Sequence, residues 1–299
     1  MVGPPMSGAD MHVHSWALSL VITFGLAVTA LVYLRGWHCL RIAFPNLIAG
    51  WRLAAFMSGL VFVWAAVASP LARLDHQSLT IHMIKHLLLM TVAAPLLLAG
   101  APAFPLVCGL PKLFIKRHSL CSVPARWLEP CSMNSVFCWI VGTAAVIGWH
   151  VPAAFQSGMH YQGIHIFEDL SFLLSGILFW SVIVQGPPSV TSSPRWSLAL
   201  YLFFATLPCD IISAFFVFCN RLVYPFYLSA PRLFSLSPLE DQECAGALMW
   251  VWVTFAYLIP AVVITLRILS PSNVRTQKAM QTAAPTGDWS RNGTQAEVR

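Results

Sequence analysis

Long apolar stretches separated by short polar segments dominate this chain. The hydrocarbon core of a membrane is about 30 Å thick, so a helix that rises about 1.5 Å per residue crosses it in roughly 20 residues. Seven apolar stretches have about this length, and they cover residues 16–34, 51–69, 81–104, 135–152, 164–185, 196–219 and 243–268. The pattern predicts an all-α, polytopic transmembrane helical bundle of about seven spans.

The composition and the two ends of the chain fit this prediction. Of the 299 residues, 58% are hydrophobic and only 9% are charged, which is too apolar for a soluble core of this size. Residues 1–15 lack the basic start and the cleavage site of a signal peptide, so we expect a retained extracytoplasmic segment. It would precede a seven-span domain over residues 16–269. The Thr- and Gln-rich residues 270–299 have no apolar periodicity and predict a disordered cytoplasmic tail.

The distribution of Lys and Arg predicts the orientation in the membrane. Most of the 17 Lys and Arg residues fall in one set of alternate loops, and basic loops stay in the cytoplasm. The N-terminus is therefore expected outside and the C-terminus inside. These loops also account for the net charge of +6, so the charge requires no nucleic-acid partner.

Histidines gather on the predicted outer side. Eight of the 10 histidines fall there, namely His12, His14, His76, His82, His86, His150, His160 and His165. A group of imidazoles in one place can bind a transition metal or haem. A single histidine at a membrane interface is common without any such role, so the group, and not one member, favours a site.

The third predicted span carries the sharpest local pattern. His82, His86 and Met90 are four residues apart and share one helix face. Two imidazoles at this spacing can hold one metal ion, and a Met90 thioether would favour cuprous copper. Met90 can equally be a packing residue. Lys85 lies in the same turn and needs an acidic partner, for which Asp210 is a candidate, either as an ion pair or as a proton relay.

A second histidine-rich stretch, WHVPAAFQSGMHYQGIHIFEDL, joins the fourth and fifth spans. His165 and Glu168 are three residues apart, so Glu168 can bind a metal directly or orient the imidazole. Asp169 adds a carboxylate, whereas His160 is expected in a solvated loop. Further along, Asp241 lies among carboxylates at a predicted helix start, where it can cap the helix or take part in metal entry or docking.

These motifs resemble the CtaG family of multi-span cytochrome c oxidase assembly proteins, which are associated with caa-type oxidases. The resemblance lies in HMIKHLLLMTVAAPLLLAGAP, in WHVPAAF with the fifth-span motif, and in YPFY followed by DQECAGALMW. It implies a bacterial plasma-membrane protein that aids copper delivery to, or insertion into, oxidase subunits. The positions that match the family pattern are His82, His86, His150, His165, Glu168, Asp241 and Gln242. The chain departs from the pattern at Asp169, where a second histidine is usual, and at Lys85, where a neutral residue is usual.

Two other functions fit some of the same residues. Histidines on several spans suit a haem-binding cytochrome, and the intramembrane charges at Lys85, Glu168 and Asp210 suit a metal or proton transporter. A transporter would need polar residues towards the cytoplasmic face, and those halves of the spans are nearly all apolar. With no nucleophile and general-base motif and no nucleotide motif, we expect no enzyme.

The prediction is therefore a copper-handling assembly factor whose partners are oxidase subunits and membrane lipid. The predicted metal ligands are His82, His86, His150, His165, Glu168 and Met90. The predicted accessory polar residues are His76, His160, Asp169, Lys85, Asp210 and Asp241.

Overall fold

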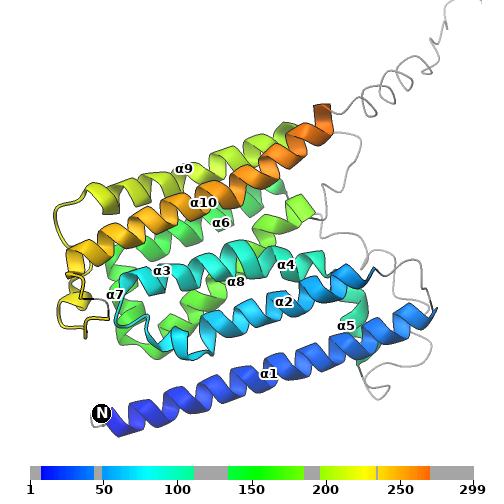
Figure 1. The fold of residues 1–299 in the computed structure, drawn as a ribbon, viewed down its shortest axis with the longest axis horizontal. Helices are drawn as coiled ribbons and strands as arrows, with labels where there is room; N and C mark the ends of the chain where they lie inside the picture. The colour runs from blue at the N-terminus through cyan, green and yellow to red at the C-terminus, as the bar shows by residue number, and fades with distance from the viewer. Residues whose placement is uncertain (1–7, 44–48, 111–133, 185–195, 234, 270–299) are drawn as a thin grey trace, which may run out of the picture.

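The computed structural model of the chain describes residues 8–43, 49–110, 134–184, 196–233 and 235–269, with side chains from residue 17 onwards (Figure 1). These residues form helices and connecting loops, without a strand among them. The α-helices are α1 (Gly8–Ala43), α2 (Gly50–Val67), α3 (Leu79–Leu87), α4 (Ala94–Ala99), α5 (Ala103–Gly109), α6 (Ser135–His150), α7 (Pro152–His160), α8 (Gln162–Val184), α9 (Trp196–Phe218) and α10 (Pro238–Leu269). Short 3-10 turns are η1 (Pro70–Arg73) and η4 (Pro225–Leu228), and η2 (Leu88–Ala93) is a π-helix.

Six of the described helical segments are long and apolar enough to cross a membrane, and a bent pair raises the number to seven. The prediction of an all-helical, multi-span bundle is confirmed. The third span runs from Leu79 to Ala99, because α3, η2 and α4 continue one another. The fourth differs from the predicted 135–152: α6 ends at His150, Pro152 opens α7, and the two helices meet at 74°. Proline suits a helix start and not a helix interior, which explains the break. The predicted tail at 270–299 and residues 1–7 lie outside the described part of the chain.

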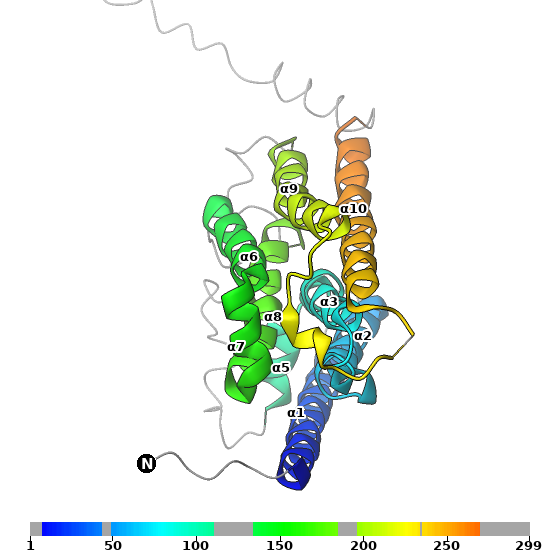
Figure 2. The same cartoon turned by 90° about the vertical axis from the view of Figure 1, so that its left-hand side faces the viewer.

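The span Leu79–Ala99 is the central element of the bundle. It packs against α2, α8 and α10 (Figures 1 and 2) and is the most buried of the candidate spans. The helix α1 lies at the edge, against α2 and α5. There the α1 and α5 backbones approach so closely that a Cβ on Gly36 would lie 1.7 Å from the Pro105 carbonyl oxygen. Only glycine allows this contact.

One end of the bundle is built around the N-terminus of α3. The Asp241 carboxylate of α10 accepts hydrogen bonds from Ser78 Oγ (2.8 Å), from the Leu79 amide (2.6 Å), and from the amide and hydroxyl of Thr80 (3.3 and 2.7 Å). The first amides of a helix have no partner within the helix. Asp241 supplies that partner from another helix: it lies in the first turn of α10, as expected, but its carboxylate caps α3.

The loop between α9 and α10 folds over the same end, as Figure 2 shows. Gln242 fixes the start of this loop, since its side-chain oxygen accepts from the Val223 amide and its amide group donates to the Arg221 carbonyl. Farther along, Tyr224 donates to the His150 carbonyl (2.9 Å) and Tyr227 to the Asp75 carbonyl (2.8 Å). The loop thereby ties together α6, α10 and the segment before α3.

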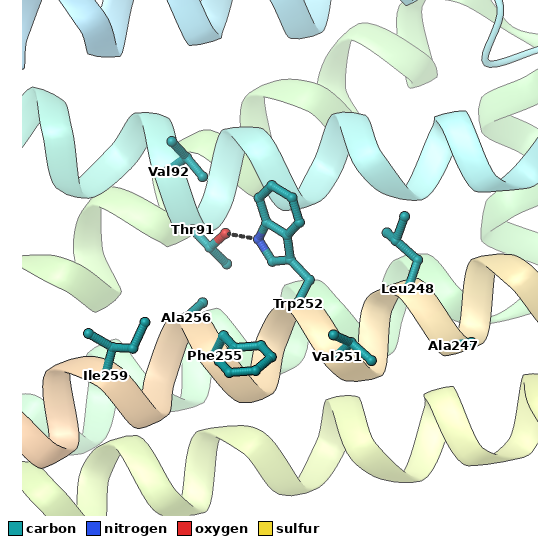
Figure 3. A pocket seen from close by; sticks show the side chains of 9 residues that line it. All are labelled: Thr91, Val92, Ala247, Leu248, Val251, Trp252, Phe255, Ala256 and Ile259. Carbon is teal, nitrogen blue, oxygen red and sulfur yellow. Dashed lines mark hydrogen bonds between the residues drawn. The ribbon is translucent and has the colours of Figure 1, made fainter.

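An apolar groove of about 690 Å³ lies between η2 and α10. Figure 3 shows its lining, in which Trp252 of α10 donates a hydrogen bond to Thr91 Oγ1 of η2 (2.8 Å). The other lining side chains are apolar. The groove therefore offers hydrocarbon contact and little polar chemistry.

Replacement of Asp241 by Ala should destabilise the bundle strongly. The substitution leaves buried donors at the start of α3 without an acceptor, and each such group costs about 1–3 kcal/mol. The matched control is Glu240→Ala, since Glu240 is exposed and its carboxylate accepts from the Ser237 amide at the start of its own helix. Thermal unfolding of the detergent-purified variants should show a much larger drop for Asp241→Ala. Equal drops would contradict the assigned cap.

Candidate metal centre

Helices α3 and α8 bring the polar side chains of the bundle together. His82, Lys85 and His86 lie within two turns of α3, and the spacing of three and four residues directs them to one side. From α8, Glu168 and Asp169 approach the same region. The capped start of α3 fixes the helix rotation, so the cap on α3 also positions the site.

Three buried side chains form the group that we call the deep triad: His82, His86 and Glu168. The two Nε2 atoms of His82 and His86 are 2.8 Å apart. Glu168 Oε1 lies 3.4 Å from His82 Nε2 and 3.2 Å from His86 Nε2. The three residues are 0%, 5% and 1% exposed, respectively. Two nitrogens and one oxygen thus converge on one point in the interior.

These separations fit one metal ion. A point equidistant from atoms 2.8, 3.2 and 3.4 Å apart lies about 1.8 Å from each, slightly less than the metal–nitrogen distance of about 2.0–2.1 Å. His82, His86 and Glu168 would therefore hold one such ion through two imidazole nitrogens and one carboxylate oxygen.

Aromatic and small residues hold the deep triad in place. The His86 ring stacks on Phe172 (4.2 Å between centroids), and the His82 ring packs edge-on against Phe155 (5.0 Å). At Gly158 of α7, a Cβ would lie 2.9 Å from Glu168 Oε2. The sharp bend into α7 thus lets its backbone come close to the carboxylate. The Nδ1 atoms of both histidines are buried without a hydrogen-bond partner in the described structure.

Lys85 has two acidic partners beside the deep triad. Its ammonium lies 2.7 Å from Asp75 Oδ2, 3.1 Å from Asp169 Oδ1 and 2.7 Å from His165 Nε2. The predicted pairing with Asp210 is wrong, because the loop before α3 supplies the carboxylate of Asp75 instead. Asp210 lies on α9, and its Oδ1 atom has no hydrogen-bond partner among the described residues.

Asp75 is the functional residue that sequence reasoning missed. It is 1% exposed, although it lies in a short loop. Burial alone would raise the pKa of Asp75, but Lys85 and His165 outweigh it and hold the pKa of this carboxyl well below its usual range. One signal was available: an unpaired lysine in the third span requires a nearby acid, and Asp75 precedes Lys85 by ten residues.

His165 connects the deep triad with a second group, which we call the rim triad: Asp75, His76 and His165. His165 Nδ1 lies 3.3 Å from Glu168 Oε2, and His165 Nε2 lies 2.9 Å from Asp75 Oδ2. His76 Nε2 lies 3.8 Å from Asp75 Oδ1, and the His76 side chain is 47% exposed. Polar side chains thus continue from the surface at His76 to the interior at Glu168.

Three other predicted site residues lie outside both triads. Met90 belongs to the hydrophobic core, and its methyl group faces Gly142 of α6. His150 Nδ1 forms a hydrogen bond with the Val146 carbonyl (2.6 Å). His150 Nε2 is buried and has no hydrogen-bond partner among the described residues. His160 is exposed at the end of α7 and is bonded to the Gln156 carbonyl. The side chains of His12 and His14 are not among those described.

The fold and the site define the class: a multi-span helical membrane protein with a buried histidine–carboxylate cluster at one end of the bundle. Residues 31–270 match the family model for the cytochrome c oxidase caa3 assembly factor, Caa3_CtaG, and the chain belongs to this family. The resemblance drawn from the sequence motifs is thereby confirmed.

The chain is also similar to an uncharacterized protein of Mycobacterium leprae (strain TN), ML1998. The two sequences are 23% identical over 267 residues, which cover 85% of this chain and 39% of the relative. The chain thus spans well under half the length of that protein. No solved structure matches the chain.

Replacement of Asp75 by Asn should destabilise the protein, because it removes one of two carboxylates from a buried ammonium. Breaking a buried ion pair costs about 3–5 kcal/mol, and the remaining partner Asp169 places the expected loss at about 3 kcal/mol. Asp210→Asn, which changes a carboxylate that does not contact Lys85, is the matched control. Urea or thermal unfolding in detergent measures both. A loss in the control as large as in Asp75→Asn would refute the assigned pairing.

Proposed function

We propose that this protein binds copper at the deep triad, on the extracytoplasmic side of the plasma membrane, and releases it to a cytochrome c oxidase subunit during assembly. One observation carries the proposal: two imidazole nitrogens and one carboxylate oxygen lie 2.8–3.4 Å apart in the interior of an oxidase assembly factor. Two imidazole nitrogens and a carboxylate oxygen this close in a buried site have the composition and spacing of ligands to one cation.

The donor set bears on the form of copper. Imidazole suits copper, whereas a carboxylate is a poor ligand for the soft cuprous ion. Thioether and thiolate ligands would favour cuprous copper, and Met90, the thioether predicted from the sequence, packs in the hydrophobic core. The two imidazoles and the Glu168 carboxylate therefore favour cupric copper as the cargo. Three ligands also suit a metal that must be passed on.

The distribution of charge supports the extracytoplasmic side. The site lies at the end of the bundle that carries the connecting segments 68–78, 151–161 and 219–237, the second of which contains α7. These loops hold three arginines, Arg73, Arg221 and Arg232, and no lysine. Among the described residues, Arg35 and Arg41 belong to the C-terminal part of α1, Arg52 to the start of α2 and Arg267 to the end of α10. These helix ends lie opposite the site in Figure 1, and the positive-inside rule assigns such a basic end to the cytoplasm. Copper would thus be bound on the extracytoplasmic side of the membrane.

The geometry bears on the haem alternative as well. Two axial imidazoles bind iron from opposite faces, with their nitrogens about 4 Å apart across the metal. His82 Nε2 and His86 Nε2 are 2.8 Å apart and neighbours on one helix, so they suit two adjacent positions around a smaller site. We therefore favour a carrier of a single metal ion over a cytochrome, and a non-catalytic role in keeping with the family.

Simultaneous substitution of His82 and His86 by Ala should abolish stoichiometric copper binding. The deep triad would lose both nitrogens, and one carboxylate does not retain the ion at micromolar copper. Copper is measured by elemental analysis after copper loading and gel filtration in detergent. His160→Ala, which removes an exposed histidine outside both triads, should keep the wild-type amount. Retention of copper by the double variant would overturn the assigned ligands.

In cells, Glu168→Gln should impair oxidase maturation while the protein stays in the membrane. The amide keeps the size of the side chain but removes the negative charge that binds the metal. We expect at least a tenfold loss of assembled, copper-containing oxidase, and partial recovery with added copper. Oxidase activity at the wild-type level in this variant would contradict copper delivery through the deep triad.

A further inference from the structure

The rim triad has the composition of a metal site, yet a side chain of the protein lies where the metal would bind. Its donor atoms are Asp75 Oδ2 and His165 Nε2, 2.9 Å apart, with the imidazole of His76 beside them. The Lys85 ammonium is 2.7 Å from each of these two atoms. A metal ion bound there would take the same position at the shorter distance of about 2.0–2.2 Å.

We propose that the rim triad of Asp75, His76 and His165 is a second transition-metal site, which the Lys85 ammonium occupies as a built-in cation and keeps closed to metal. This inference rests on the proposed function, since a metal would pass through the rim triad on its way to the deep triad. Metal binding at the rim triad can nevertheless be tested separately, because none of its three residues belongs to the deep triad.

Lys85 is held so that it can leave the rim triad without losing its ion pair. The ammonium contacts Asp75 (2.7 Å) and Asp169 (3.1 Å) at the same time, and Asp169 belongs to neither triad. When a cation binds Asp75 and His165, the ammonium can remain on Asp169. The exchange replaces one buried cation by another, so the Asp75 carboxylate never stays buried without a counter-charge.

The position of the rim triad suits an entry point. The exposed fraction of the side chains falls from 47% at His76 to 13% at His165 and 2% at Glu168. His165 faces both triads, through Nε2 towards Asp75 and through Nδ1 towards Glu168. A metal that arrives from solvent therefore meets His76 first and has a continuous series of donors inward.

The test is the number of cupric ions bound by variants of Lys85. The full-length protein is purified in detergent, freed of metal with a chelator, loaded with cupric chloride and analysed by gel filtration with elemental analysis. Lys85→Met removes the ammonium. Lys85→Met/Asp169→Asn removes the ammonium together with the Asp169 carboxylate, so that no excess of negative charge stays buried. Lys85→Arg keeps the positive charge and is the matched control.

We expect one copper per wild-type or Lys85→Arg protein and two per Lys85→Met/Asp169→Asn protein. Adding His76→Ala to the charge-balanced variant should return the number to one, and that remaining ion should be lost on His82→Ala/His86→Ala. If Lys85→Met/Asp169→Asn binds no more copper than the wild type, the rim triad is not a metal site and the proposal is wrong. A wild type without copper, together with one His76-dependent copper in the variant, would instead reject the deep triad and keep this inference.

Discussion

The buried ammonium of Lys85 is the constraint on which the site depends. A charge inside a membrane protein must be neutralised locally, and Lys85 is neutralised by carboxylates from two separate segments, Asp75 before α3 and Asp169 on α8. These contacts join α8 to the start of α3, beside the place where Glu168 lies within 3.4 Å of His82 and His86. The Lys85 ammonium thus stands next to the deep triad and lies within the rim triad.

Further hydrogen bonds fix the segments that carry these charged residues. Asp241 of α10 caps α3, and the Tyr227 hydroxyl, in the loop between α9 and α10, donates a hydrogen bond to the Asp75 carbonyl. Both contacts join parts of the chain more than 150 residues apart. Aromatic rings of Phe155 and Phe172 then fix the imidazoles of the deep triad. The polar end of the bundle is therefore rigidly built, while the lipid-facing side, including the groove along α10, is apolar.

Much of the fold followed from apolar length alone, because a membrane span must hold about 20 apolar residues wherever it packs. The pairing within one helix was equally predictable, as with His82 and His86, or His165 and Glu168, since helical spacing decides it. Contacts between helices could not be predicted in this way. The sequence suggested Asp210 as the partner of Lys85, whereas the structure shows Asp75. Asp241 likewise caps a helix that is distant in the sequence. Helix rotation and loop closure decide these contacts, and a hydropathy pattern contains neither. The assigned role of Met90 illustrates the same point, because a shared helix face did not reveal the close approach of Gly142.

X-ray absorption of the wild-type protein loaded with one equivalent of cupric ion would test the deep triad most directly. The account predicts a first coordination shell of two imidazole nitrogens and one or more oxygens at about 2.0 Å, without sulfur. A sulfur scatterer near 2.3 Å, or a shell with no imidazole signature, would contradict it, because neither can arise from His82, His86 and Glu168.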